Sequence, residues 1–292
     1  MSRSIWMNGT LVAPEDATIS VFDHGLLYGD GCFEGIRVYG GAAFKLRSHV
    51  DRMQDSARSL YLDPPCTADE LVEAIELTIE ANRLEEGYVR VVYTRGKGSL
   101  GLNPFSCEHP SCIIIADTIS LYPEAMYRDG MGVIIAKRPR VPIHCLDPQI
   151  KSLNYLNNIL AKVEAIEAGV LEAIMLNCDG NVAECTGDNL FLIKDGVIST
   201  PDTSAGMLHG ITRQFVIDEV APACGWTVEE VIVTPDDLFA ADEIFLTGTA
   251  AEVIGVTSVD NRDIGTGSVG PITRQLIEQF HTMVAGELAK GV

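Results

Sequence analysis

The segment that decides the fold runs from Glu184 to Arg213 and reads ECTGDNLFLIKDGVISTPDTSAGMLHGITR. Its apolar runs are strand-like and are separated by Asp195-Gly196, a dipeptide typical of a hairpin turn. At its end, Gly210-Ile211-Thr212 opens a run that predicts a helix over residues 211–221. The segment therefore predicts strands that lead directly into a helix, within a domain that mixes the two.

The sequence on either side extends this mixed pattern. Residues 132–138 read as a strand, residues 155–169 as a helix, and residues 172–200 as strands joined by turns. Downstream, Pro235 and Pro271 stand where the first turns of two more helices are expected.

The N-terminal part also alternates between strand-like and helix-like pieces. Thr67 stands three places before Glu70, the capping-box spacing, which predicts a helix over residues 67–83. Residues 87–95 and 112–121 read as strands, and a polar, Pro-bearing stretch follows them. We therefore expect an α+β protein with a small α/β N-terminal domain over residues 1–117, a linker over 118–129 and a larger C-terminal domain over 130–292.

The composition excludes several classes of protein. The 292 residues are 47% hydrophobic and 21% charged, which is typical of a soluble globular chain, and they contain neither a membrane-length apolar run nor a secretory signal. A formal net charge of −20 disfavours binding to nucleic acid or to anionic membranes. We expect a cytoplasmic protein; if the charge reflects a salty cytoplasm, its melting temperature should depend on salt between low and molar concentrations.

Cysteines and glycines supply two patterns that imitate functional sites. The eight cysteines form no CxxC pair, and Cys107 to Cys112 match no zinc spacing, so we expect free thiols and no metal. Residues 96–101 are a literal GxGxxG, but Asn103 and Pro104 follow where a dinucleotide fold needs a helix.

One lysine lies in a setting that favours chemistry over a solvated surface. Lys151, in the stretch QIKSLNYLNN, has apolar neighbours and precedes a helical run; desolvation and nearby cations would help its amine to lose a proton. A pyridoxal phosphate enzyme needs such a lysine, an acid at the ring nitrogen, a donor to the phenolate and a phosphate cradle. The candidates are Glu184, Tyr155, and for the phosphate Ile211, Thr212, Thr249 and Arg52. Taken singly, each also has a structural interpretation, as a turn carboxylate, a core aromatic, a helix cap or a solvated helix residue.

The combination resembles a known family. Residues 184–213 match throughout the long signature of class IV pyridoxal phosphate aminotransferases, and FEGIR at 33–37, the Arg52 region, IKSLNYLNN and FLTGTAAEV resemble the branched-chain amino acid aminotransferases. This resemblance implies a fold-type IV enzyme with a barrel-like larger domain, with the cofactor between the two domains, and a homodimer or a multiple of dimers. It also implies that Lys151 bonds covalently to the cofactor and moves a proton, and that Leu208 packs on the cofactor ring.

The resemblance further implies a substrate pocket with apolar and aromatic walls. Its members would be Tyr28, Phe33, Tyr88 and Tyr122, with Thr249 and Ala250 offering backbone donors to the α-carboxylate. Glutamate must also be accepted, and Arg90 is the expected partner of its distal carboxylate because it shares a strand face with Tyr88.

The substrate stays open at this point. Arg95 lies in a Thr-Arg-Gly setting similar to that of a carboxylate-binding arginine in D-amino-acid aminotransferases; a regular strand makes it structural, and a bend at Gly96 would undo that inference. We expect reversible transfer from L-leucine, L-isoleucine or L-valine to 2-oxoglutarate. The alternatives are a D-alanine aminotransferase, an aminodeoxychorismate lyase and a protein that holds pyridoxal phosphate without turnover.

Overall fold

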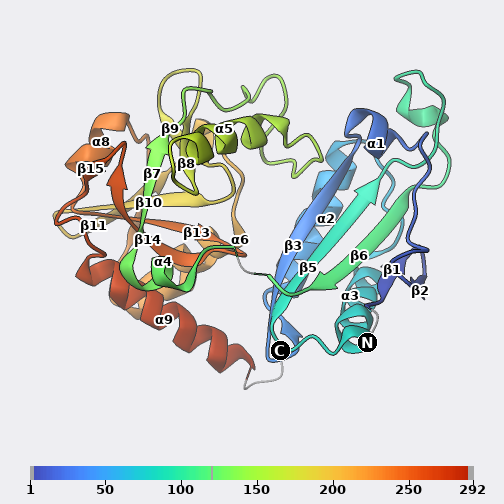
Figure 1. The fold of residues 1–292 in the computed structure, drawn as a ribbon, viewed down its shortest axis with the longest axis horizontal. Helices are drawn as coiled ribbons and strands as arrows, with labels where there is room; N and C mark the ends of the chain where they lie inside the picture. Colours follow the sequence, from blue (N-terminus) through green and yellow to red (C-terminus); the bar gives the residue numbers. More distant parts are fainter. Residues whose placement is uncertain (1–2, 120, 289–292) are drawn as a thin grey trace. The chain divides into compact units, whose positions relative to one another are not determined.

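The computed structural model describes residues 3–119 and 121–288. Within these residues the chain forms two compact units, shown in Figure 1. The N-terminal unit comprises residues 3–119 and 150–154, and the C-terminal unit comprises residues 121–149 and 155–288. The stretch expected as a linker therefore differs from the observed division, since residues 121–129 belong to the C-terminal unit. Lys151 also differs from its expected domain, because residues 150–154 return to the N-terminal unit.

The N-terminal unit is an antiparallel sheet with two long helices on one face (Figure 1). Its sheet order is β2-β1-β6-β5-β3-β4. The elements are β1 (Ile5–Met7), β2 (Thr10–Val12), α1 (His24–Tyr28), β3 (Gly31–Tyr39), β4 (Ala42–Ala43), α2 (Leu46–Ser59), α3 (Ala68–Asn82), β5 (Gly87–Thr94), the 3-10 turn η1 (Pro104–Ser106) and β6 (Ser111–Asp117). The predicted capping box is confirmed: the Thr67 hydroxyl accepts from the Glu70 backbone N–H, and the Glu70 carboxylate accepts from the Thr67 backbone N–H.

Strand β5 confirms the predicted alternation. Val89, Val91 and Tyr93 are buried against the core that the helices cover, with Leu71 and Ile75 of α3 among the residues packed there. Tyr88, Arg90 and Val92 are half-buried on the opposite face. One face of this sheet is therefore closed by apolar packing, and the other is open for polar and aromatic side chains.

The C-terminal unit is a curled, mixed sheet with helices around it (Figure 1). The strand order is β12-β11-β10-β13-β14-β7-β8-β9, and β9 also contacts β10 and β11, so the sheet curls back on itself as expected for a barrel-like domain. The elements are α4 (Glu124–Asp129), β7 (Met131–Ile135), α5 (Leu156–Glu167), β8 (Ala173–Leu176), β9 (Val182–Cys185), β10 (Asn189–Lys194), β11 (Val197–Pro201), the 3-10 turn η2 (Thr203–Ala205), α6 (Ile211–Phe215), the π-helix η3 (Val216–Val220), α7 (Ala221–Ala223), β12 (Val228–Val231), α8 (Pro235–Ala240), β13 (Glu243–Gly248), β14 (Glu252–Val259), β15 (Arg262–Asp263) and α9 (Pro271–Leu288).

The helix predicted over 211–221 exists but is not uniform. It begins at Ile211 as expected, becomes π-helical over Val216–Val220, and then contains Pro222. Because proline has no N–H to donate, it cannot complete the α-helical bond of its turn, and a widened turn precedes it. Among the helices of the described residues, none has the length and apolar composition of a membrane span.

Candidate active site

Lys151 is fixed by its backbone to two elements of the N-terminal unit. Its N–H donates to the Ser56 hydroxyl of α2 at 3.2 Å, and its carbonyl accepts from the Phe33 N–H of β3 at 3.0 Å. The next residue, Ser152, forms a bridge with Cys32. The lysine therefore has a defined backbone position on the edge of β3, although no strand of its own surrounds it.

The side chain of Lys151 lies on the open face of the same sheet. Its Nζ is 4.7 Å from the centroid of the Phe33 ring. The guanidinium of Arg90 is 4.5 Å from that same centroid and 5.5 Å from the ring of Tyr88. The structure thus brings four predicted residues together, with two cations against one aromatic ring.

Gly35 explains how Tyr88 can lie flat across this face. The two residues are neighbours on adjacent strands, since Gly35 pairs with Arg90 and Arg37 pairs with Tyr88. A Cβ at Gly35 would overlap the Tyr88 hydroxyl. Glycine at this position of the FEGIR motif therefore leaves room for the tyrosine next to Arg90.

Arg52 of α2 forms a two-pronged ion pair with Glu34 of β3. Its Nε donates to Glu34 Oε1 at 2.6 Å, and its Nη2 donates to Oε2 at 2.9 Å. His49 Nδ1 lies 2.8 Å from the same carboxylate. Glu34 and His49 are each 1% exposed, while the Arg52 side chain is 15% exposed. Arg52 is thus the member of this buried group that reaches toward solvent.

Opposing effects act on the ionisation of this group. Desolvation alone would raise the pKa of Glu34, but the charge of Arg52 and the hydrogen bonds from His49 and Arg52 lower it below its ordinary value. Burial is the largest cause that lowers the pKa of His49, and the charges of Arg52 and Lys151 act in the same direction. Glu34 is therefore a carboxylate and His49 a neutral donor at pH 7, and the amine of Lys151 lies close enough to this group to influence it.

Arg95, whose role the sequence left open, makes contacts that support the fold. Its Nε and Nη2 donate to the Asp30 carboxylate, each at 2.9 Å, and its guanidinium also donates to the carbonyls of Leu60 and Tyr61 at 2.6 Å. These carbonyls directly follow α2, so Arg95 caps that helix from outside. Strand β5 ends at Thr94 and Gly96 has φ +86°, so Arg95 lies just outside the regular strand, and its role follows from these contacts and not from a strand face.

Tyr28 belongs to a different set of contacts from the other predicted substrate residues. It lies at the end of α1, its hydroxyl donates to the Leu100 carbonyl, and its ring packs edge-on against His24 at 5.0 Å.

In the C-terminal unit, Glu184 is buried on β9 and held by two donors. Arg140 Nε donates to Oε1 at 2.6 Å, and the Leu208 backbone N–H donates to Oε2 at 3.0 Å. Arg140 in turn donates to Asn158 Oδ1 at 3.0 Å. Two predicted residues, Glu184 and Leu208, are therefore in direct contact, and the carboxylate is oriented by a buried cation.

Asn189 links this carboxylate to the helix start that was predicted to bind phosphate. Its side-chain amide donates to the Leu208 carbonyl at 2.9 Å, and a Cβ at Gly210 would overlap its Oδ1. Asn189 also pairs with Thr247 of β13, two residues before Thr249, and α6 lies against β13. The structure thus collects Ile211, Thr212 and Thr249 at one end of the sheet.

Gly210 leaves the first N–H groups of α6 without a side-chain cap. Arg213, in the same turn, is buried and donates to the Pro201 carbonyl and to Glu230, which ties the start of the helix to β11 and β12. Ala250 lies in the turn between β13 and β14, where its carbonyl accepts from Tyr127 at 3.4 Å.

Two predicted tyrosines have different environments. Tyr155 is half-buried and immediately precedes α5, where its carbonyl accepts from the Ile159 N–H. Tyr122 is only 3% exposed and packs in the core of the C-terminal unit. Its hydroxyl oxygen lies within hydrogen-bond distance of the carboxylates of Glu172 and Asp188, and burial together with these carboxylates raises its pKa. The structure therefore places Tyr122 inside the unit and not on an open aromatic wall.

Sequence reasoning missed several residues that position the candidates. Glu34 and His49 hold Arg52, Arg140 holds Glu184, and Asn189 and Arg213 hold the loop and the helix start at 208–212. Buried carboxylates require partners, which is the one signal available in advance, but it does not say which of 21 cationic residues each partner is.

Comparison with known proteins gives consistent results. The profile of the family described as amino-transferase class IV matches residues 31–259. The chain is 47% identical over 276 residues to a protein of Methanocaldococcus jannaschii, which covers 94% of each chain. It is 38% identical over 288 residues to a branched-chain-amino-acid aminotransferase of Pseudomonas aeruginosa, covering 97% of this chain and 93% of the relative.

A solved structure matches over nearly the full chain as well. It is the branched-chain aminotransferase of the thermophilic archaeon Thermoproteus uzoniensis with norvaline. The TM-score is 0.91 at 37% identity, over 98% of this chain and 96% of the other.

Proposed function

The chain belongs to the amino-transferase class IV family, and on that premise we propose that it is a branched-chain amino acid aminotransferase. It moves the amino group of L-leucine, L-isoleucine or L-valine to 2-oxoglutarate, reversibly, and yields branched 2-oxo acids and L-glutamate. The observation that carries the proposal is the open face on which Lys151 and Arg90 both lie against the Phe33 ring. A reactive amine, an apolar wall and a cation for a second carboxylate are thereby present together.

The proposed cofactor is pyridoxal 5′-phosphate, and the residues present fit it. The uncapped N–H groups of α6 suit a phosphate, because a helix start favours anions. Glu184 is held as an acceptor by Arg140 and the Leu208 N–H. When bound, this group accepts the amino group and withdraws electrons from the substrate carbon that loses its proton.

The chain's own residues then have distinct tasks. The amine of Lys151 would be the covalent attachment point of the cofactor and, as a free amine, would move a proton as general base and acid. Glu184 would hold a proton on the ring nitrogen, and Tyr155 would donate to the phenolic oxygen. Arg52, Ile211, Thr212 and Thr249 would hold the phosphate, and Leu208 would pack on the ring.

Arg90 supports the acceptance of two chemically different substrates. A branched aliphatic side chain requires the apolar surface of Phe33 and Tyr88, whereas glutamate requires a cation for its distal carboxylate. Arg90 lies over both rings, within reach of an acid on that face. The backbone N–H groups of Thr249 and Ala250 are the proposed donors to the α-carboxylate.

The position of Arg95 favours the L-branched substrates over D-alanine. Its guanidinium is engaged by Asp30 and by the end of α2, so a substrate carboxylate would have to displace an existing buried ion pair. Initial rates with L-leucine and D-alanine as donors decide the question. We expect L-leucine to be strongly preferred, and a preference for D-alanine would overturn the assignment.

Substitution of Arg90 tests the dual specificity. In R90M we expect the KM for 2-oxoglutarate to rise about 10- to 100-fold, the size of one charge-assisted interaction. The half-reaction with L-leucine should change less than about threefold, because an aliphatic side chain makes no ion pair with Arg90. R128M, at a highly exposed arginine, is the matched control. Equal losses for both substrates would contradict the assigned role of Arg90.

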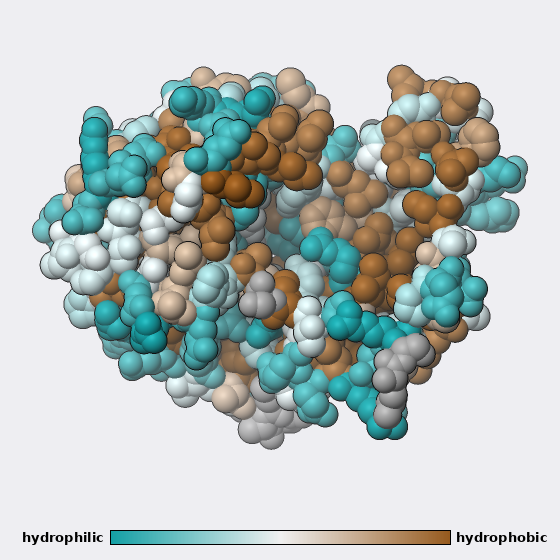
Figure 2. All heavy atoms as spheres, in the orientation of Figure 1, coloured by the Kyte–Doolittle hydropathy of each residue, from teal (hydrophilic) through white to brown (hydrophobic). Residues whose placement is uncertain are grey.

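A homo-oligomer is part of the proposal. Its support is a helix in which small and polar residues are buried and large apolar residues are exposed. Helix α5 buries Asn158, Ala161 and Ala165, while its large apolar residues stay exposed: Leu156, Ile159, Leu160, Val163 and Ile166. Figure 2 shows the resulting hydrophobic surface over α5. Exposed apolar surface of this kind marks an interface, and we propose a second copy of the chain as its partner. Light scattering should give a dimer or a multiple of it, and a monomer at micromolar concentration would exclude this.

A cytoplasmic location is likewise proposed. Its support is the set of eight free cysteines, which a reducing compartment maintains.

A further inference from the structure

The turn between β13 and β14 consists of Thr249, Ala250 and Ala251, and its first two N–H groups are the proposed donors to the substrate α-carboxylate. Such donors can hold a carboxylate only if the backbone that carries them keeps a fixed position. Ala251 is fully buried in the core of the C-terminal unit, whereas Thr249 and Ala250 are half-buried. Contacts from other segments must therefore hold the first part of the turn.

Asp188 lies beside the backbone at the point where this turn begins. It directly precedes β10 and lies opposite Gly248, because Asn189 pairs with Thr247 in the antiparallel register of β10 and β13. A Cβ at Gly248 would be 2.0 Å from Asp188 Oδ1. Glycine thus lets the carboxylate contact the backbone, and the start of the turn cannot shift toward β10 without meeting that carboxylate.

Tyr122 contacts the other oxygen of the same carboxylate. Its hydroxyl oxygen is 2.9 Å from Asp188 Oδ2 and 3.1 Å from Glu172 Oε2. A tyrosine has one proton to donate. Glu172 already accepts from Lys162 Nζ at 3.2 Å and from the Thr186 N–H at 2.9 Å. The proton of Tyr122 therefore goes to Asp188 and fixes the orientation of its side chain.

The segment that carries Tyr122 contacts the turn a second time. The hydroxyl of Tyr127, in α4, donates to the Ala250 carbonyl at 3.4 Å, and the rings of Tyr122 and Tyr127 are 6.3 Å apart. Helix α4 also lies against β14 (Figure 1). Residues 121–129 therefore support the turn at two places, directly at Ala250 and through Asp188 at Gly248.

We propose that Tyr122 and Asp188 are positioning residues that fix the β13–β14 turn for binding of the substrate α-carboxylate. This inference rests on the proposed function, because it assigns a support to the site that holds both substrates. L-leucine and 2-oxoglutarate each carry a carboxylate on the reacting carbon, so loss of the support weakens the binding of both. The effect differs from that of R90M, which is expected to fall mainly on 2-oxoglutarate.

Substitution of Tyr122 in the full-length holoenzyme tests this role. In Y122F we expect the KM values for L-leucine and for 2-oxoglutarate to rise together by about 10-fold, the size of one hydrogen bond to a charged group. The inhibition constant of 4-methylpentanoate, which has the carboxylate and side chain of leucine but no amine, should rise by the same factor. The kcat should stay within about threefold, because no group that moves a proton is lost.

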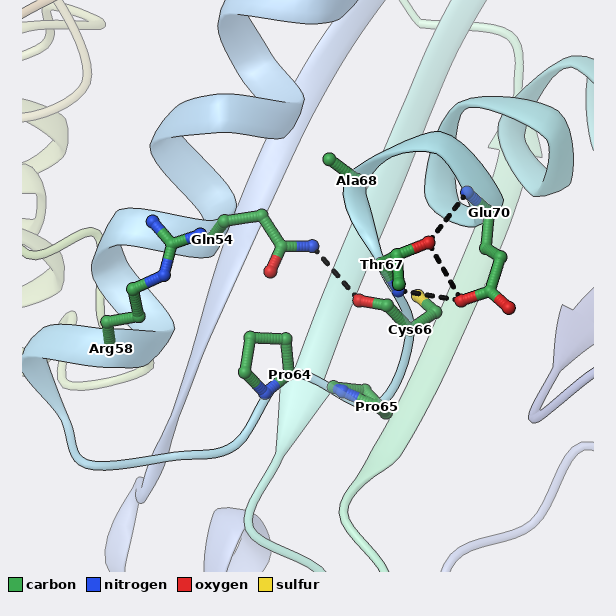
Figure 3. Close-up of a pocket in the computed structure, with 8 residues that line it drawn as sticks. All are labelled: Gln54, Arg58, Pro64, Pro65, Cys66, Thr67, Ala68 and Glu70. Carbon is green, nitrogen blue, oxygen red and sulfur yellow. Dashed lines mark hydrogen bonds between the residues drawn. The ribbon is translucent and has the colours of Figure 1, made fainter.

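Y93F is the matched control for the loss of a buried tyrosine hydroxyl. Tyr93 belongs to the N-terminal unit and accepts from Gln54, whose amide also donates to the Cys66 carbonyl (Figure 3). Both variants should unfold at a lower urea concentration, but only Y122F should change the two KM values and the inhibition constant. Equal changes in the two variants, or a folded Y122F with unchanged constants, would overturn the inference.

Two further variants test the contact without removing the tyrosine. The φ of Gly248 lies outside the left-handed region, so G248A acts through the clash of its methyl group with Asp188, and it should raise the same three constants. D188N keeps an oxygen that can accept from Tyr122 and should stay within about threefold of the unmodified enzyme. Unchanged constants in G248A would contradict the inference even if Y122F failed to fold.

The two levels of the proposal fail in different ways. If the unmodified holoenzyme did not transaminate L-leucine, the proposed function would be wrong, and this inference would be wrong with it. Normal turnover of L-leucine, with constants that do not change in Y122F and G248A, would overturn the inference alone.

Discussion

Each unit contains a buried pair of one arginine and one glutamate, and the two pairs differ in how they are buried. In the N-terminal unit Glu34 is 1% exposed and Arg52 15%, so the arginine is the member with access to solvent. In the C-terminal unit Arg140 and Glu184 are 9% and 7% exposed, and both are enclosed. The N–O distance is 2.6 Å in both pairs.

The difference indicates which member of each pair is available to a ligand and how much stability is lost when its partner is removed. Glu34 has a second donor in His49 and holds Arg52, the proposed phosphate ligand, as a cation. Glu184 accepts from Arg140 and is the proposed partner of the ring nitrogen. An arginine–glutamate pair thus fixes a cation in the N-terminal unit and an anion in the C-terminal unit.

Removing Arg140 is expected to have the largest effect. R140M removes the cation that donates to the buried Glu184 carboxylate, which should lower the free energy of unfolding by about 3–5 kcal/mol. Urea unfolding of the purified variant measures this loss. The double variant R140M/E184Q should recover most of it, because no uncompensated charge remains. A double variant as unstable as R140M would show that the ion pair is not the cause.

Changing the carboxylate of the same pair separates chemistry from stability. E184Q cannot hold a proton on the ring nitrogen, and kcat should fall by about 10²- to 10³-fold. E34Q is the matched variant of the other pair and should keep kcat within a few-fold at saturating pyridoxal phosphate. Similar losses of kcat in both variants would erase the proposed distinction between the pairs.

Removing Arg52 should weaken cofactor binding more than it weakens the fold. In R52M the Kd for pyridoxal phosphate should rise about 10- to 30-fold, for the loss of one charge-assisted contact. The unfolding free energy should fall by less than in R140M, because Glu34 keeps the donor His49. Fluorescence titration of the apoenzyme measures the first quantity; an unchanged Kd would show that Arg52 serves only Glu34.

The smallest expected effect concerns acid stability. The folded pKa of Glu34 lies below its unfolded value near 4.5, so the unfolded chain binds the proton first as the pH falls. The stability that Glu34 contributes is therefore complete above about pH 4.5 and is lost below it. Between pH 5 and 3, E34Q should lose about 1–2 kcal/mol less than the unmodified chain. Parallel curves of melting temperature against pH for the two proteins would contradict this.

Local patterns predicted much of the fold because they depend on neighbours in sequence. The capping box at Thr67 and Glu70, the alternation along β5 and the helix start at Ile211 all involve contacts of a few residues. The family signature added the barrel-like character of the C-terminal unit, which no local pattern shows.

The supporting contacts could not be predicted because they join distant parts of the chain. Arg140 and Glu184 are 44 residues apart, and Arg95 reaches carbonyls 34 and 35 residues away. For the same reason the expected linker and the unit that contains Lys151 differed from the structure: residues 150–154 hydrogen-bond to β3 and α2, and Tyr122 is buried in the C-terminal core. These placements follow from tertiary packing, which sequence periodicity does not encode.

The central claim is that the amine of Lys151 carries the cofactor. Reduction of the holoenzyme with borohydride, followed by peptide mapping, tests it directly, since the reduced bond survives digestion. We predict a phosphopyridoxyl group on Lys151 and an unlabelled chain in K151A, with transamination abolished. A label on any other lysine, or transamination that persists in K151A, would contradict the account.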